Sequence, residues 1–106
     1  MELSELQKRA LEIRKQYSEL ESQKGIMWER KDIVQGFVGD VGDLVKLTMA
    51  KDNLREIADV DQKLAHELSD CLWSILVIAS KYNVDIEHSF FQTMNEIEQR
   101  IQKQLS

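Results

Sequence analysis

The chain has 106 residues, a length that fits one domain spanning residues 1–106. It contains no proline, four glycines and 31% charged residues, and this composition favours long helices over sheets. Its formal net charge of −5 argues against a nucleic acid polymer as partner, because phosphate-backbone binding needs clustered lysine and arginine. The negative charge does not exclude a phosphate ligand that a metal ion bridges to the protein.

Neither secretion nor membrane insertion is expected from the apolar segments. Residues 1–10 lack the apolar segment of a signal peptide, and the longest apolar run, residues 71–79, is far below the ~20 residues that span a bilayer. Cys71 is the only cysteine, which excludes an internal disulfide and a multi-cysteine metal site. We therefore expect a cytoplasmic protein in which Cys71 is a small buried hydrophobic residue.

Apolar residues at helical spacing predict four helices, over about residues 2–22, 30–53, 60–82 and 86–104. Gly25 and Asn83 are expected at helix ends, whereas Asp59 or Asp61 begins the third helix and Asp85 the fourth. The short connections favour an all-α, antiparallel four-helix bundle. Because the third helix is apolar on two sides, we expect homo-oligomerisation to complete the bundle.

Three glycines lie inside the second predicted helix. Gly36, Gly39 and Gly42 recur every three residues, and each costs a helix about 1 kcal/mol relative to alanine. The usual compensation is the close approach of another helix or of a ligand. We expect such an approach along this face.

Two carboxylate pairs are the strongest candidates for a functional site. Asp40 and Asp43 on the second helix, and Glu67 and Asp70 on the third, are each spaced three apart and so share a helical face. If the two helices pack antiparallel, the pairs can face each other, and carboxylates at close range either protonate or bind cations. Mg²⁺ suits such oxygen ligands. The alternative is that these acids are solvated, as most acidic residues at this spacing are.

The sequence around the two pairs resembles a known family. Residues 39–44, Gly-Asp-Val-Gly-Asp-Leu, resemble the E-E-V-G-E-L motif of the MazG-like nucleotide pyrophosphohydrolases, within the all-α NTP pyrophosphatase superfamily. Residues 67–72, Glu-Leu-Ser-Asp-Cys-Leu, are similar to that family's E-L-x-D-x-L motif. The resemblance covers about residues 30–95 and includes the order of the helices.

This resemblance implies a hydrolase that needs Mg²⁺, with Mn²⁺ as the alternative ion. It would convert a nucleoside triphosphate (an NTP or dNTP) to the monophosphate and pyrophosphate, in the house-cleaning of nucleotide pools. Asp40, Asp43, Glu67 and Asp70 would be the catalytic metal ligands. The protein would act as a homodimer or homotetramer.

The sequence departs from the family pattern at both ends of the expected site. Aspartates replace the glutamates of the first motif, and Gly39 replaces an acid. On the fourth helix, Thr93 and Ile97 stand where relatives often have a substrate-binding lysine and asparagine. The residues expected to contact substrate are Trp28, Ser74, Asn95 and Arg100, of which Asn95 or Arg100 would replace the lysine and asparagine if the alignment shifts. Trp28 would stack on a base, although a structural plug at the bundle end is the favoured interpretation of this residue.

Two other functions fit the same pattern. The chain would be a non-catalytic helical interaction module, a diverged pseudoenzyme that keeps the bundle and the oligomer, if the changes on the fourth helix have abolished turnover. Alternatively, the acidic pairs would bind a divalent metal for stability alone. A di-iron bundle is disfavoured because the chain has no Glu-x-x-His.

Overall fold

The computed structural model describes residues 2–106, and this part of the chain contains four helices and no strand. The helices are α1 (Leu3–Gln23), α2 (Arg30–Lys51), α3 (Val60–Lys81) and α4 (Ile86–Leu105). The expected all-α class and the four helical segments are therefore confirmed, with ends that differ from the predicted ones by at most two residues. Across residues 2–106, no helix combines the length and the apolar character that crossing a membrane requires.

The first three helices end in the same way. Gly25, Asn53 and Asn83 follow the helix ends with φ of 74°, 61° and 58°, in the left-handed region that glycine and asparagine tolerate best. The next residue then donates its N–H to a carbonyl in the last turn, as Val84 does to Ala79 at 2.8 Å. This is the Schellman arrangement, and it fixes where each connection leaves its helix.

The helix starts differ more from one another. Asp85 caps α4, because its carboxylate accepts a hydrogen bond from the His88 N–H at 3.2 Å. Asp59 precedes α3 with a φ of 54° and makes no side-chain cap hydrogen bond. Asp61, the other candidate cap, instead accepts a 2.7 Å bond from Lys51 at the end of α2. This ion pair ties the two ends of the connection between α2 and α3.

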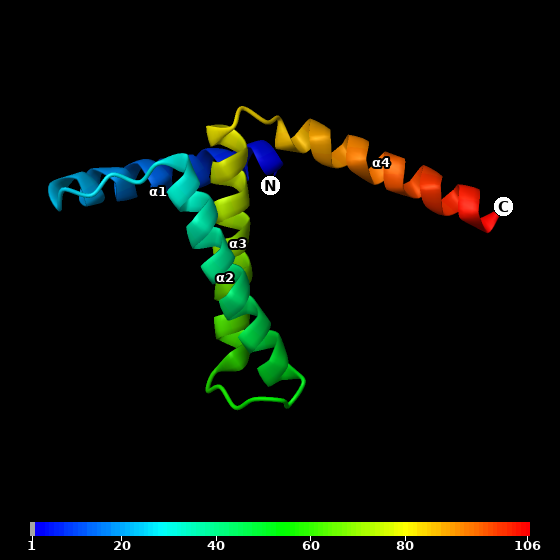
Figure 1. Cartoon of the computed structure of the whole chain (residues 1–106), viewed down its shortest axis with the longest axis horizontal. Coiled ribbons are helices and arrows are strands. Elements are labelled where there is room, and N and C mark those ends of the chain that lie inside the picture. The colour runs from blue at the N-terminus through cyan, green and yellow to red at the C-terminus, as the bar shows by residue number, and fades with distance from the viewer. Residues whose placement is uncertain (1) are drawn as a thin grey trace.

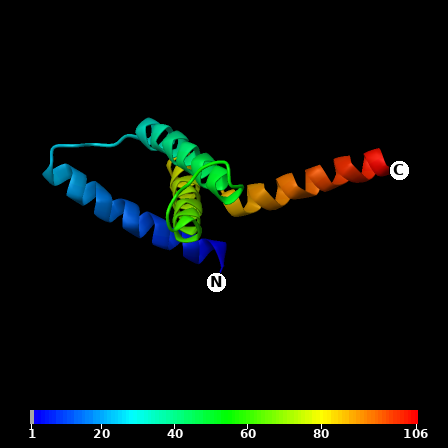
Figure 2. The same ribbon diagram turned by 90° about the horizontal axis from the view of Figure 1, so that it is seen from below.

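Helix α3 is the centre of the fold. The chain reverses between α2 and α3, and these two helices lie side by side as a hairpin, while α1 crosses α3 near its C-terminal end (Figure 1). Figure 2 shows α3 between α2 and α1. The core is correspondingly small, and its buried side chains come mostly from α3: Ala10, Ile33, Leu47, Cys71, Leu76, Val77 and Ala79.

Helix α4 projects away from the other three helices (Figure 1). The radius of gyration is 17.1 Å, well above the ~13 Å of a compact chain of about 100 residues. Much of the apolar stripe of α4 is exposed, including Phe90, Phe91 and Ile101. The same is true of Val38 and Val45 on α2. A single chain therefore has the helices of a bundle but leaves wide apolar faces open.

Candidate functional site

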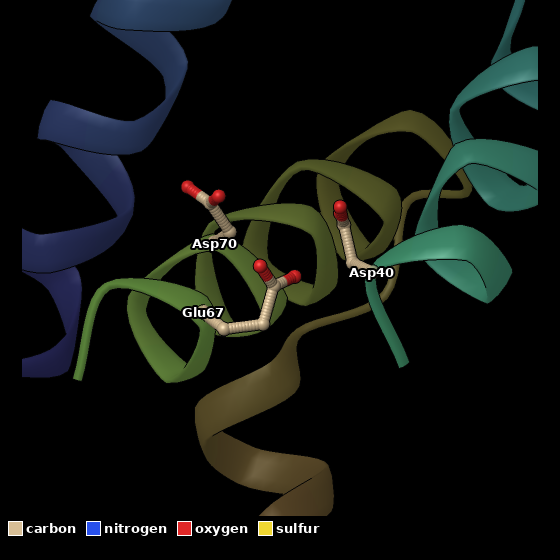
Figure 3. A group of neighbouring side chains, drawn as sticks. All are labelled: Asp40, Glu67 and Asp70. Carbon is tan, nitrogen blue, oxygen red and sulfur yellow. The ribbon is translucent and has the colours of Figure 1, made fainter. Parts of the chain in front are cut away.

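Three of the four predicted carboxylates come together between α2 and α3. Asp40 on α2 and Glu67 and Asp70 on α3 each offer an oxygen atom, and these atoms all lie within 4.8 Å of one another. Figure 3 shows the carboxyl group of Glu67 between those of the two aspartates. The hairpin produces this convergence, because it packs the acidic face of α2 against the acidic face of α3. All three side chains are partly buried.

Glu67 is the most constrained member of this acidic cluster. Its Oε1 atom is buried and has no hydrogen-bond partner among the described residues. Burial raises the pKa of Glu67 most, and the charges of Asp40, Asp70 and Asp43 raise it further, in that order. Nearby His66 lowers the same pKa. A buried carboxylate oxygen without a donor is costly, and a cation would satisfy it.

The two aspartates of the cluster are each oriented by a neighbour. Ser74 Oγ donates a hydrogen bond to Asp40 Oδ2 at 3.4 Å, and one turn separates Ser74 from Asp70 on α3. The Nε2 atom of His66 lies 3.3 Å from Asp70 Oδ2. Side chains of this kind hold carboxylates in place and leave their other oxygens free for a ligand. Of the substrate residues that the sequence predicts, Ser74 thus lies directly beside the cluster.

Asp43, the fourth predicted acid, lies beside the cluster and not within it. One turn along α2 from Asp40, it lines a hollow together with Glu67, Lys46 and Lys63. Its charge still reaches Glu67, as the raised pKa shows. The two lysines place positive charge next to the acidic cluster, and a lysine ammonium can bind phosphate as a point charge. Lys46 carried no distinguishing signal in the sequence.

An aromatic pocket opens on the other side of Asp40. It has a volume of about 250 Å³ and is lined by Asp40, Ser74 and residues from α1, α2, α3 and the first connection, which are Arg14, Tyr17, Glu21, Trp28, Ile33, Gly36, Trp73 and Val77. The Trp73 ring is fixed by a 3.0 Å hydrogen bond from its Nε1 to the Ala10 carbonyl, and it packs against Tyr17 with ring centroids 5.7 Å apart. Three aromatic rings therefore wall a cavity that reaches the acidic cluster.

Trp28 forms part of the pocket wall beside α2. Its ring lies against Gly36, where an added Cβ would come within 3.2 Å of the ring atom Cζ3. A close approach to Gly36 is therefore found, but it comes from a side chain of the same chain and not from another helix or a ligand. Gly39 and Gly42 have no such close approach, because a Cβ at either position would find no atom within 4 Å. In a single chain, nothing packs against that stretch of α2 closely enough to require glycine.

An ion pair in the pocket wall was not anticipated from the sequence. Arg14 and Glu21, both on α1, pair with each other, and their side chains are only 12% and 16% exposed. Arg14 also lies over the Trp28 ring, 6.0 Å from its centroid. The seven-residue spacing, which puts opposite charges on one helical face, was the available signal.

The two remaining predicted substrate contacts lie elsewhere in the fold. Asn95 and Arg100 are on α4, which projects away from α2 and α3, the helices that carry the acidic cluster (Figure 1). Thr93 and Ile97 lie on the same helix. The described chain therefore brings Trp28 and Ser74 to the pocket beside the cluster, but none of these four α4 residues.

Comparison of the chain with known protein families, with curated proteins and with solved structures found no match.

Proposed function

We propose that the protein is a Mg²⁺-dependent nucleoside triphosphate pyrophosphohydrolase, as its resemblance to the MazG-like enzymes implies. The observation that carries this proposal is the convergence of Asp40, Glu67 and Asp70 within 4.8 Å beside an aromatic pocket. Mg²⁺ prefers oxygen ligands and commonly binds through one or two carboxylates plus substrate phosphates. The unpartnered Oε1 of Glu67 supports a cation at this place.

The surroundings of the cluster suggest how a nucleotide would lie across it. The aromatic pocket on one side suits a base, since bases stack on aromatic rings. The hollow lined by Lys46 and Lys63 on the other side suits phosphates. The α–β phosphoanhydride link would then lie at the acids. When bound there, Mg²⁺ would neutralise phosphate charge and lower the pKa of an attacking water.

The residues of the site have distinct roles in this proposal. Asp40, Glu67 and Asp70 hold the metal, and Asp43 adds negative charge one turn away. Ser74 and His66 position the two aspartates of the cluster. Trp28 stacks on the base, and its contact with Gly36 allows it to lie close to α2.

We further propose that the active form is a homodimer or homotetramer in which a second chain completes the bundle. The many large apolar side chains exposed on α2, α3 and α4 support this assembly, because extensive exposed apolar surface commonly marks an interaction site. A second chain packed on α2 would also account for Gly39 and Gly42. Its α4 is the source from which Asn95 or Arg100 would reach a site.

A turnover assay tests the enzymatic proposal. The protein is incubated with a panel of NTPs and dNTPs plus Mg²⁺, and release of pyrophosphate and monophosphate is measured. Glu67→Gln and Asp70→Asn are expected to lose at least 100-fold in activity, whereas Glu19→Gln on the exposed side of α1 serves as the matched control. Absence of pyrophosphate from every nucleotide would overturn the proposed function. Turnover that survives both substitutions would overturn the site.

The second candidate function is a non-catalytic helical interaction module. The apolar stripe of α4 favours it, because Phe90 and Phe91 on this helix are largely exposed in the described part of the chain. In that case the oligomer would form without turnover.

A rise in thermal stability with Mg²⁺, again without turnover, would indicate a metal that serves stability alone.

A further inference from the structure

We infer that the Arg14–Glu21 pair reads the edge of the base and makes guanine the preferred one. This inference rests on the proposed function, because it assigns the base specificity of the same site. It starts from a feature that the metal site does not use, namely a nearly buried ion pair in the wall of the aromatic pocket.

The position of the pair defines what it can contact. Asp40 and Ser74 are the polar groups at the end of the pocket that meets the acidic cluster. Arg14 and Glu21 are the charged groups on its α1 wall, and the rest of the lining is chiefly aromatic and aliphatic. A base held against the rings with its phosphates toward the acids would turn its polar edge to this pair.

A purely structural role explains the pair less well. Removing two charges from water can cost more free energy than their mutual attraction returns. A hydrophobic pair of similar size therefore often stabilises a protein as well or better. Arg14 gains some energy from the Trp28 ring at 6.0 Å and from a 3.4 Å hydrogen bond to Ser18. Neither contact requires a glutamate at position 21 that lines a cavity.

The chemistry of the two side chains selects among the bases. Arginine offers five N–H donors and no acceptor, while an ionised carboxylate only accepts. Arg14 and Glu21 can therefore remain paired and still bond to a base. Guanine offers the O6 and N7 acceptors that arginine binds with two hydrogen bonds, the commonest specific contact to a base. Its N1–H and N2–H groups are two adjacent donors that match the two oxygens of a carboxylate.

The other bases match only in part. Adenine and cytosine each present one amino group and no ring N–H next to it, so Glu21 would gain a single kind of donor. Uracil and thymine present one ring N–H between two carbonyl oxygens, and one of those oxygens would meet the carboxylate. A matched bidentate contact discriminates between bases by about tenfold or more.

Binding of the four ribonucleoside monophosphates, measured by calorimetry with Mg²⁺ present, tests the inference. These ligands share one phosphate and one sugar, so differences in Kd report the base. GMP is expected to bind about tenfold more tightly than AMP, CMP and UMP. Glu21→Gln should reduce this preference, because an amide supplies only one acceptor oxygen for N1–H and N2–H, while Glu19→Gln should leave the preference intact.

A second variant protects the test against a folding defect. Arg14→Lys keeps the charge and the pairing with Glu21 but loses the planar fork, so the preference for GMP should fall while the melting temperature changes little. Equal binding of the four monophosphates, or a GMP preference that neither substitution reduces, would overturn the inference. Pyrophosphate release is measured separately, so turnover without base preference would reject this inference alone. Loss of all turnover with GMP preference intact would reject only the enzymatic proposal.

Discussion

The ring of Trp28 lies so close to Gly36 that a methyl group at this glycine would stand 3.2 Å from Cζ3. The Trp28 ring, in the connection before α2, thus lies against the helix and forms part of the wall of the aromatic pocket. The absence of a side chain at position 36 thus shapes the pocket as directly as the residues that line it.

Gly36→Ala should therefore separate stability from nucleotide binding. The substitution favours the helix by about 1 kcal/mol in propensity but requires the half-exposed Trp28 ring to move. We expect KM for the preferred nucleotide to rise several-fold with little change in the melting temperature. Gly39→Ala, at a position with open space, is the control, and its KM should stay at the wild-type value. An unchanged KM in Gly36→Ala would show that the position of Trp28 is immaterial.

Mg²⁺ should stabilise the wild-type protein and fail to stabilise Glu67→Gln. A ligand that binds only the folded state raises the melting temperature with its concentration. Without metal, Glu67→Gln should melt several degrees above the wild type, because the substitution removes a charge that burial and three neighbouring carboxylates disfavour. Differential scanning calorimetry with Mg²⁺ and with EDTA measures both effects. A metal-free variant that melts below the wild type would contradict the repulsion.

The raised pKa of Glu67 predicts a specific pH dependence of metal-free stability. A glutamate in an unfolded chain has a pKa of about 4.3. Between this pH and the higher pKa of the folded state, Glu67 is protonated in the folded protein and ionised in the unfolded one. Stability of the wild type relative to Glu67→Gln should therefore fall as pH rises through this window, then level off above the folded pKa. Melting temperatures of the two proteins in EDTA, compared across pH, give the curve. A difference that grows in the opposite direction would exclude a raised pKa.

Lys46 and Lys63 should contribute to binding of the phosphates. An exposed charge pair contributes about 1 kcal/mol at contact distance, so Lys63→Ala should raise KM for the triphosphate about fivefold. The ranking of bases should not change, since the pocket that holds the base lies on the other side of Asp40. Lys8→Ala on α1 provides a control of equal charge. Raised ionic strength should weaken binding in the wild type more than in Lys63→Ala.

The apolar faces of α2 and α4 should hold the chains together. Val45, which is 51% exposed, lies on the open face of α2, so Val45→Glu is expected to shift the protein from oligomer to monomer in analytical ultracentrifugation. Ser22→Glu introduces the same charge at the exposed end of α1 and should leave the oligomer intact. A wild-type protein that sediments as a monomer at high concentration would contradict the proposed assembly.

Local signals made the helices predictable. Gly25 and Asn83 ended α1 and α3 as expected, because their left-handed φ values are a property of residue type. The paired spacing of Asp40 with Asp43 and of Glu67 with Asp70 indicated the acidic face, but not that Asp43 would stand aside. That outcome depends on how far the two helices are offset in the hairpin, which no single helix encodes.

The direction of α4 and the aromatic pocket were not predictable in the same way. The apolar stripe of α4 requires a partner but does not say which chain provides it. Arg14 lies over the Trp28 ring, and the pair lines one pocket with Trp28 and Trp73, which come from distant parts of the sequence. The reason for glycine at positions 39 and 42 likewise does not lie within the described chain, where an added Cβ would find open space.

Because α4 projects away from the other three helices, folding of a single chain centres on the hairpin of α2 and α3. Most contacts between helices in a single chain join α2 to α3, which are neighbours in sequence, so the hairpin has a short loop to close and should form quickly. The chain has no proline, which removes the slow isomerisation phase common in refolding. A slow step in refolding would then be bimolecular, and its half-time should halve when the protein concentration doubles.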